Sequence, residues 1–409
     1  MISAVDRLLP PERVDLATYR SGGGYEALDE FDRDQVALVA RMYAFSLTGL
    51  GGAHFPFAAK VAAALQTPGP RYIVANGAED EPGSQKDKYL LERNPHVVIE
   101  GALLAAVAID ADELIFYVRE SLNDARASLA DALAELANTG LMRDRSIRVH
   151  DAPTAYVAGE ASAAIQSLMG EEAKPVAQPP YPTESGFLGR PTVVSNVETL
   201  ANIPRMLRGT GSTSQTYTRL TTVTGDVVRP GVFEVDPSAT SLRDLIELAG
   251  GVLDGAPVKA IQPGGPSSAY VPEIQLDTRL TNEAIREIGS QPGCLAIRVI
   301  STSSCMVHEV AAVASFFARE QCGQCPGCRM KTSSYSTLLS KVVQGPASWD
   351  LLGQFATIDE FVSDLPRRCA LIEMPTAPVA SAIEHFRSDF AEHIEKGECS
   401  LCTSSKPQE

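Results

Sequence analysis

The sequence predicts an α/β protein in three parts: a parallel sheet covered by helices, a small α+β domain and a C-terminal helical bundle. Three observations lead to this prediction. Apolar strands alternate with amphipathic helices over residues 71–170, short β segments occupy 218–300, and only helical periodicity remains over 306–394. The expected domains are therefore residues 1–217, 218–300 and 301–395, followed by a polar tail at 396–409.

The α/β part has a regular order. Residues 1–45 are helix-like in pieces, and GLGGAHFPFAAKVAAAL (49–65) is a glycine-rich turn that runs into a helix. Strict alternation of strands and helices then indicates a parallel sheet with both faces covered. The expected elements are the strands RYIVAN (71–76), ELIFYVRE (113–120) and SIRVHDA (146–152), and the helices HVVIEGALLAAVAI (96–109), SLNDARASLADALAELANTG (121–140) and the one entered by AYVAGEASAAIQSLMG (155–170).

The later segments differ in composition. Residues 171–192 are rich in proline and glycine without periodicity, which predicts a long loop suited to binding. The α+β domain contains one expected helix, SLRDLIELAG (241–250), among the β segments RLTTVTG, GVFEV, KAIQPGG and LAIRVI. The bundle is predicted from the amphipathic runs VHEVAAVASFFARE (307–320), SYSTLLSKVV (334–343) and PVASAIEHFRSDFAEHI (378–394).

Charge and hydropathy exclude several classes of function. The 409-residue chain carries a net charge of −16, which disfavours binding to nucleic acid or to an anionic membrane surface. The N-terminus has no signal-peptide pattern, and no apolar run is long enough to span a bilayer. We expect a cytoplasmic protein, without direct membrane insertion, whose partners are proteins or small molecules.

The cysteines gather near the C-terminus, which fits a local cofactor site better than a disulfide framework. QCGQCPGCRM (321–330) presents three thiols in a C-x2-C-x2-C spacing, which is typical of [4Fe–4S] clusters. Zinc sites prefer two separated ligand pairs, so zinc fits this motif less well, and thiols without a metal are the remaining interpretation. The candidates for the fourth ligand are Cys294, Cys305, Cys369, Cys399 and Cys402.

Spacing gives these candidates different characters. A helical excursion could return Cys369 to the motif. Cys399 and Cys402 read as a mobile thiol pair on the polar tail, with a redox disulfide or a metal shared with a partner as the other interpretations. Cys294 and Cys305 flank a predicted strand and read as small buried hydrophobic residues rather than ligands.

Two further stretches suggest a cofactor site. GLGGAHFP (49–56) precedes the first strand of the α/β unit, so it is not a G-x-G-x-x-G fingerprint, although its glycines allow close approach of a phosphate or a flat ring. ANGAEDEPGSQKDKYLLERNPH (75–96) opens from a strand into an acidic loop, where parallel sheets bind ligands. A plain turn and a solvated charge run are the structural alternatives.

Taken together, the motifs resemble the family of NADH- and FMN-binding (flavoprotein) subunits of respiratory complex I and of related NAD-linked hydrogenases and formate dehydrogenases. The chain looks like a short, divergent member. The resembling stretches, in family order, are GLGGAHFP (G-R-G-G-A-G-F-P), ANGAEDEPG (N-A-D-E-x-E-P-G), YVAGEASA (Y-I-C-G-E-E-T-A), PPYPTESGFLGRPTVVSNVETL (P-P-F-P-x-x-S-G-x-x-G-x-P-T-x-x-N-N-V-E-T-L) and QCGQCPGCR (S-C-G-x-C-x-P-C-R).

The resemblance implies a Rossmann-like flavin-binding domain with an N-terminal helical segment, a ubiquitin-like β-grasp domain and a helical bundle with one [4Fe–4S] cluster. The implied cluster ligands are Cys322, Cys325, Cys328 and Cys369. The implied FMN contacts are Gly49, Gly51, Gly52, Lys60, Asn76, Tyr156, Gly159, Glu160, Ser195, Asn196 and Thr199. The implied contacts to the nicotinamide dinucleotide are Phe55, Glu79, Glu81 and Tyr181.

The implied reaction passes a hydride from NADH or NADPH to FMN N5, and single electrons then reach the cluster. This step requires no catalytic acid or base. The expected acceptor is a separate ferredoxin or other small iron–sulfur protein. The alternative is an NADH-oxidising subunit of a larger complex paired with a [2Fe–2S] subunit. A donor other than nicotinamide and a non-catalytic flavin module are further possibilities.

Several positions depart from the family pattern on the side of the dinucleotide. An acidic residue at position 161 would repel a 2′-phosphate, whereas Ala161 removes that charge, so NADPH joins NADH as a candidate donor. His54 adds a ring that we expect to pack beside the flavin. The departures are Leu50 for Arg, His54 for Gly, Ala78 for Asp, Ala161 for Glu, Gln178 for Lys and Ser195 for Asn.

Overall fold

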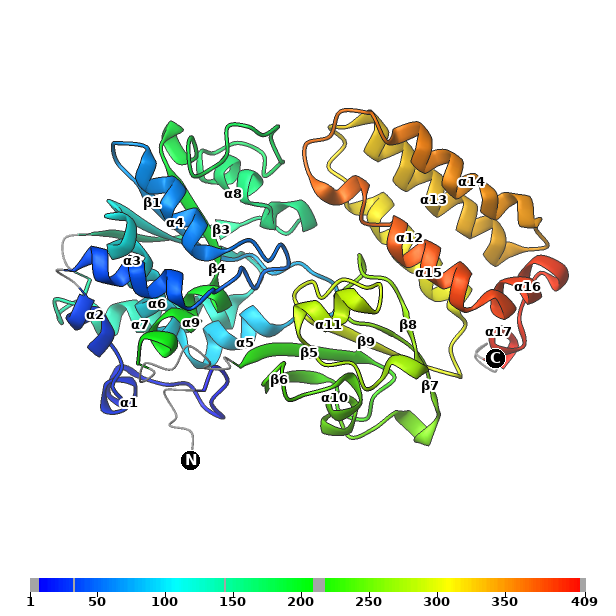
Figure 1. Ribbon diagram of the computed structural model, residues 1–409, viewed down its shortest axis with the longest axis horizontal. Coiled ribbons are helices and arrows are strands. Elements are labelled where there is room, and N and C mark those ends of the chain that lie inside the picture. The colour runs from blue at the N-terminus through cyan, green and yellow to red at the C-terminus, as the bar shows by residue number, and fades with distance from the viewer. Residues whose placement is uncertain (1–6, 32–33, 143–144, 209–217, 405–409) are drawn as a thin grey trace. The chain divides into compact units, whose positions relative to one another are not determined.

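The computed structural model describes residues 7–31, 34–142, 145–208 and 218–404 (Figure 1). It forms two compact units. The first contains residues 1–80, 84–221 and 232–236, and the second contains 81–83, 222–231 and 237–409. The expected domain boundary at residue 217 and the end of the polar tail at 405–409 lie outside the described residues.

The first unit is built on a four-stranded parallel sheet, which confirms the predicted parallel topology. Its strand order is β3-β2-β1-β4. Asn76, near the end of β1, pairs in register with Asn196, the last residue of β4. The strands are β1 (Tyr72–Gly77), β2 (Glu113–Arg119), β3 (Ser146–Ala152) and β4 (Thr192–Asn196). β4 was not predicted, because its five residues follow the proline-rich stretch without a signal of their own.

Both faces of this sheet are covered, as alternation of strands and helices predicts. Ile73 and Ala75 belong to one core, shared with α6 and α9, whereas Val74 belongs to a second core, shared with α8. Helix α6 is buried along its whole length, which explains its apolar sequence. It approaches α9 so closely that a Cβ atom on Gly101 would lie 1.9 Å from the carbonyl oxygen of Leu200.

The helices of the first unit include one that the sequence did not predict. Helix α5 occupies part of the acidic stretch that we interpreted as a loop, and burial of Leu90 and Leu91 stabilises it. The helices are α1 (Leu16–Ser21), α2 (Glu26–Phe31), α3 (Gln35–Ala44), α4 (Phe57–Gln66), α5 (Lys86–Arg93), α6 (Pro95–Ile109), α7 (Asn123–Leu136), α8 (Ala161–Leu168) and α9 (Val197–Arg208), with the short 3-10 helices η2 (Tyr156–Gly159) and η3 (Phe187–Gly189).

The α+β segment forms a five-stranded sheet of order β6-β5-β9-β7-β8. β5 and β9 are parallel, while β7 is antiparallel to both β8 and β9. Ser241 and Asp244 form a capping box at the start of α10. The elements are β5 (Arg219–Gly225), β6 (Gly231–Val235), β7 (Val258–Gln262), β8 (Val271–Pro272), β9 (Ala296–Ser301), α10 (Leu242–Leu248), α11 (Asn282–Glu287), η4 (Leu253–Gly255) and η5 (Glu273–Gln275).

The C-terminal segment is helical, as predicted, with two differences. The run 378–394 forms two helices instead of one, because Phe386 leaves the helical conformation at φ −120° and ψ 38°. Helix α14 was not predicted. The helices are α12 (Met306–Glu320), α13 (Pro326–Gln344), α14 (Trp349–Val362), α15 (Thr376–His385), α16 (Arg387–Lys396), α17 (Ser400–Ser404) and η6 (Ala370–Ile372). Among the described residues, no helix is both long and apolar enough to cross a membrane.

Candidate functional site: a glycine loop at the sheet edge and a four-thiol motif

The glycine loop is held by backbone bonds at its base. The Gly49 amide donates to the Phe55 carbonyl (2.9 Å), so the chain closes on itself before α4 begins. Gly52 has φ +110°, a conformation that a residue with a Cβ atom rarely adopts. The loop is also tied to α9, because the Leu50 amide donates to the Thr199 hydroxyl (2.8 Å). The predicted turn and helix are therefore confirmed.

Two glycines mark close approaches at the carboxyl edge of the sheet. A Cβ atom on Gly51 would lie 3.1 Å from the Cβ atom of Asn196, and one on Gly159 would lie 3.1 Å from the Ala78 carbonyl oxygen. The Asn76 side chain donates to the Gly159 carbonyl (2.9 Å), which joins β1 to η2. Parallel strands end at one edge, so these sequence-distant stretches meet there.

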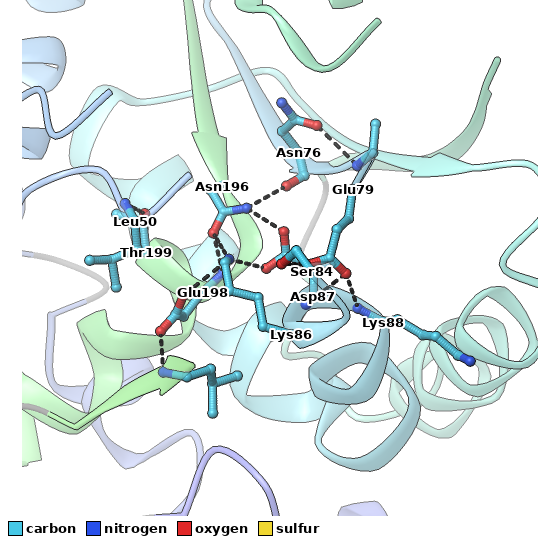
Figure 2. A network of polar contacts seen from close by, with 12 residues as sticks. Leu50, Asn76, Glu79, Ser84, Lys86, Asp87, Lys88, Asn196, Glu198 and Thr199 are labelled. Carbon is cyan, nitrogen blue, oxygen red and sulfur yellow. Dashed lines mark hydrogen bonds and ion pairs between the residues drawn. The ribbon is translucent and has the colours of Figure 1, made fainter. Parts of the chain in front are cut away.

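A polar network crosses this edge (Figure 2). The amide of Asn196 donates to Asp87 Oδ2 (2.6 Å), and its oxygen accepts from Lys86 Nζ (3.2 Å). Lys86 also forms ion pairs with Asp87 (2.6 Å) and Glu198 (3.0 Å). These three charged side chains are buried, and the network fixes the orientation of the Asn196 amide beside the glycine loop.

Sequence reasoning missed Lys86, Asp87 and Glu198. Lys86 and Asp87 open α5 inside the stretch interpreted as a loop, and Glu198 lies in the first turn of α9 within the VETL motif. A signal was present, since polar residues that directly follow strands of a parallel sheet lie at its ligand-binding edge. The mutual pairing of these residues depends on strand order, which residue types do not reveal.

Lys60 provides a cation at the same end of the unit. Its ammonium group donates to the Val194 carbonyl in β4 (2.9 Å). Burial lowers the pKa of Lys60, because the charged ammonium loses hydration. An anionic ligand would compensate for that loss, so Lys60 fits the phosphate-binding role that the resemblance implies.

Glu79 is a carboxyl group with an unusual protonation equilibrium. Burial raises its pKa to about 7, and the nearby charge of Asp87 acts in the same direction. Hydrogen bonds from the Ser84 hydroxyl (2.5 Å) and from the backbone amides of Asp87 and Lys88 (3.1 Å each) oppose the rise. At neutral pH the Glu79 carboxyl is therefore divided between its two protonation states.

Glu160 holds a structural position next to this edge. Its carboxylate caps α8 by accepting from the Ser162 and Ala163 amides (2.9 and 3.0 Å). Ala161 is the first residue of α8 and directly follows this cap. A second carboxylate at position 161 would therefore lie beside that of Glu160.

The remaining predicted contacts lie in varied surroundings. Ser195 and Thr199 are buried at the end of β4 and the start of α9, and Tyr156 begins η2. Phe55 and Tyr181 are exposed large side chains, in the glycine loop and in the proline-rich loop. Glu81 belongs to the second unit, where a Cβ atom on Gly265 would lie 2.3 Å from its carboxylate oxygen. The role of these residues toward a dinucleotide remains a prediction.

The C-x2-C-x2-C motif lies at the start of α13. Cys325 directly precedes the helix, and Cys328 is in its first turn. The pKa of Cys328 is raised to about 12, first by burial and then by charge on Cys369, Cys325 and Cys322. Four thiols that disfavour each other's ionisation in this way require a cation to become thiolates together. The donor set therefore fits a metal cluster, with Cys369 beside the three motif cysteines.

The other cysteines correct one expectation. Cys294 and Cys305 are buried, as predicted for small hydrophobic residues. The interpretation of Cys399 and Cys402 as a mobile pair on a polar tail is wrong. Cys399 is only 2% exposed and packs in the core of the bundle, because the segment after α16 folds back onto it.

These features define a class, the α/β proteins that combine a glycine-lined cofactor site at a sheet edge with a thiolate metal centre. Family models identify the member. Residues 42–205 match the Nuo51 FMN-binding domain, 220–269 match the SLBB domain, and 308–393 match the NADH-ubiquinone oxidoreductase-F iron-sulfur binding region.

Individual relatives agree over nearly the full chain. The F 2 subunit of NADH-quinone oxidoreductase from Rhizobium meliloti is 33% identical over 405 residues, covering 94% of this chain and 95% of the relative. The corresponding F subunit from Escherichia coli is 32% identical over 403 residues, covering 93% and 90%. In an NAD+-reducing [NiFe]-hydrogenase in the H2-reduced state, one solved chain is 30% identical with a TM-score of 0.81, covering 94% of this chain and 68% of that chain. The chain belongs to the family of NADH-quinone oxidoreductase F subunits.

Proposed function

We propose that this protein oxidises NADH or NADPH with bound FMN and passes single electrons through a [4Fe–4S] cluster to a separate ferredoxin-type iron–sulfur protein. The observation that carries the proposal is the glycine loop against the carboxyl edge of the sheet, with Asn76, Asn196 and the buried Lys60 beside it. The names of the relatives refer to NADH or NAD+, which supports nicotinamide as the donor.

The described residues have separate tasks in this proposal. Gly51 and Gly52 leave a face without side chains for the flavin ring, and Asn196 faces it with an amide held by Lys86 and Asp87. Lys60 binds the phosphate. Bound FMN supplies a group that accepts a hydride and releases electrons singly. Glu79, with its pKa near 7, bears on the charge of the adjoining pocket.

We assign FMN to Gly49, Gly51, Gly52, Lys60, Asn76, Tyr156, Gly159, Glu160, Ser195, Asn196 and Thr199. We assign the dinucleotide to Phe55, Glu79, Glu81 and Tyr181, and the cluster to Cys322, Cys325, Cys328 and Cys369. We also propose that the segments 1–217, 218–300 and 301–395 are a Rossmann-like flavin domain, a ubiquitin-like β-grasp domain and the cluster-carrying bundle of a cytoplasmic protein. The match of 220–269 to the SLBB domain supports the middle assignment.

A second assembly is favoured by the names of the relatives. These relatives are subunits of quinone oxidoreductases or belong to a hydrogenase, which supports this chain as the NADH-oxidising subunit of a larger complex paired with a [2Fe–2S] subunit. Copurification from the native source distinguishes the two proposals. A stoichiometric [2Fe–2S] subunit supports the complex, and a chain that reduces ferredoxin without one supports the stand-alone enzyme.

The deciding test is anaerobic titration of the purified holoprotein. We expect a flavin spectrum that bleaches on addition of NADH or NADPH, and the effective donor names the substrate. A flavin that stays oxidised with both donors contradicts the proposal.

Replacement of Lys60 tests the phosphate assignment. We expect K60M to weaken FMN binding at least about tenfold, since a charged hydrogen bond contributes about 1.5–3 kcal/mol. The matched control K174M removes a half-exposed lysine of the proline-rich loop and should retain the wild-type FMN content. Equal flavin loss in both variants contradicts the role of Lys60.

A further inference from the structure

A second group of metal-binding side chains lies in the C-terminal bundle, apart from the C-x2-C-x2-C motif. Cys305 directly precedes α12 and His308 is in its first turn. His393 is in α16, and Cys402 is in α17. Thus three segments that are far apart in the sequence each bring sulfur or imidazole ligands to one place.

The ligand atoms are close enough for a single ion. One atom each of Cys305, His308, His393 and Cys402 lies within 4.8 Å of the other three. His393 Nε2 is 3.3 Å from Cys305 Sγ and 3.5 Å from Cys402 Sγ. A tetrahedral zinc site with ordinary bond lengths requires ligand atoms about 3.3–3.8 Å apart. The two measured distances fall in this interval.

The fold holds the two ends of the site together independently of a metal. Asp389, one turn before His393 in α16, accepts a hydrogen bond from the Met306 amide at the start of α12 (3.0 Å) and pairs with Lys259. The Ser400 amide donates to Glu392 Oε2 (3.2 Å), which returns the C-terminal segment to α16. His393 is fully buried, whereas His308 is exposed, so the site has a solvent side through which an ion could enter.

The sequence spacing agrees with this arrangement. Cys305-x2-His308 and Cys399-x2-Cys402 are two ligand pairs separated by a long insertion, and His393 precedes the second pair. Two distant pairs are the spacing that zinc prefers, in contrast to the three close thiols before α13. This pattern was not recognised from the sequence, because the first pair is divided between a strand end and a helix start.

We propose that Cys305, His308, His393 and Cys402 bind one structural zinc ion. A mixed sulfur and nitrogen donor set in tetrahedral proximity selects zinc over the hard cations, which prefer oxygen. A two-iron cluster fits less well, because ligands on opposite irons lie farther apart than these four atoms do. Cys399, whose Sγ lies 3.1 Å from that of Cys402, is a neighbouring thiol outside the ligand set.

The zinc ion would fasten the C-terminal segment to the start of α12. Helix α12 leads at its other end into the C-x2-C-x2-C loop, so its position matters for that motif. A zinc ion that bridges α12, α16 and α17 would stabilise the bundle in the way that structural zinc sites stabilise small domains.

Metal analysis of the anaerobically purified full-length holoprotein tests the proposal. We expect about one zinc per chain in addition to about four irons. Replacing zinc by Co2+ should produce intense visible bands of tetrahedral cobalt and thiolate-to-cobalt charge transfer. Protein that contains four irons but no zinc, and that gives no such bands after incubation with Co2+, overturns the proposal.

Variants separate the zinc site from the iron site. C402S and H308A should lose zinc and keep iron and flavin, whereas C322S should lose iron and keep zinc. H308A alters an exposed side chain and so remains informative if C402S does not fold. The matched controls C294S and H385A remove a cysteine and a histidine elsewhere and should keep the metal. Retention of zinc in both C402S and H308A overturns the assignment.

Cys399 gives a final distinction. C399S should retain one zinc per chain. Loss of zinc in C399S with retention in H308A would replace His308 by Cys399 and overturn the proposed ligand set. A Cys399–Cys402 disulfide in zinc-free holoprotein, found by mass spectrometry after thiol labelling, would also contradict it.

Discussion

The ammonium group of Lys86 lies 3.0 Å from Glu198 Oε2, and both side chains are buried. The pair joins the first residue of α5 to the first turn of α9. Glu198 also accepts from the Leu220 amide (2.7 Å), which ties the start of β5 to the same carboxylate. One ion pair thus links a segment that we interpreted as a loop to a helix and a strand around the candidate cofactor site.

Breaking the Lys86–Glu198 pair should destabilise the fold strongly. K86M leaves the carboxylates of Asp87 and Glu198 buried without their cation, which typically costs about 3–5 kcal/mol. Urea unfolding followed by circular dichroism measures the loss. The control K88M lies on the same helix in a half-exposed i,i+4 pair and should change the free energy of unfolding by less than about 0.5 kcal/mol. Similar values for K86M and K88M would contradict a buried ion pair.

The two helical glycines Gly101 and Gly353 should respond in opposite directions to alanine. A Cβ atom at Gly101 would lie 1.9 Å from a backbone oxygen, so G101A forces α6 away from α9 and should cost about 1–3 kcal/mol. A Cβ atom at Gly353 in α14 would meet no described heavy atom within 4 Å, so G353A should stabilise by up to about 1 kcal/mol. Thermal unfolding of the two variants checks both signs. A neutral G101A would show that the close approach of α6 and α9 is not retained in solution.

Glu79 should make the stability pH-dependent between about 4.5 and 7. Its folded pKa of about 7 exceeds the ordinary value of 4.5, so the folded state holds a proton that the unfolded state releases in this range. Its contribution is fully present below pH 4.5 and is lost as the pH rises through 7. E79Q should therefore flatten the decline by up to about 1.4 kcal/mol per pH unit. Urea unfolding across this range measures the slope, and the exposed control E171Q should match the wild type. Equal slopes in E79Q and the wild type contradict the raised pKa.

Ala161 should govern the choice between NADPH and NADH. A161E adds a carboxylate beside Glu160 at the start of α8, and repulsion of a 2′-phosphate by about 1.4 kcal/mol corresponds to a tenfold loss. We expect kcat/KM for NADPH to fall about tenfold while the value for NADH changes much less. Steady-state kinetics with an artificial acceptor measure both. An equal fall with the two donors would mean that position 161 does not face the 2′ position.

Some of the fold could be predicted because the signal is local. The apolar alternation of β1, α6 and β2 reports their burial directly, since each residue's polarity reflects the face that it presents. β4 and α5 escaped prediction, because five residues after a proline-rich stretch and a charged run after an acidic loop have no period of their own. Their burial comes from neighbours far away in the chain.

The candidate site divides in the same way. The glycine loop, Asn76, Asn196 and the four cysteines are recognisable from motifs, because their spacing and residue types are fixed by the groups that they would hold. The pairing of Lys86 with Glu198 and the raised pKa of Glu79 have no sequence signal. They arise from burial and from charges on other elements.

The sequence by itself determined the order of strands and helices, the motifs that identify the family and the thiols of the C-x2-C-x2-C loop. Only the tertiary structure decided that Cys305 and His308 meet His393 and Cys402, and that Cys399 is buried. The physical reason is distance along the chain. Local periodicity reports which face of an element is covered, but not which distant element covers it. A metal site assembled from α12, α16 and α17 exists only once the helices of the bundle have packed.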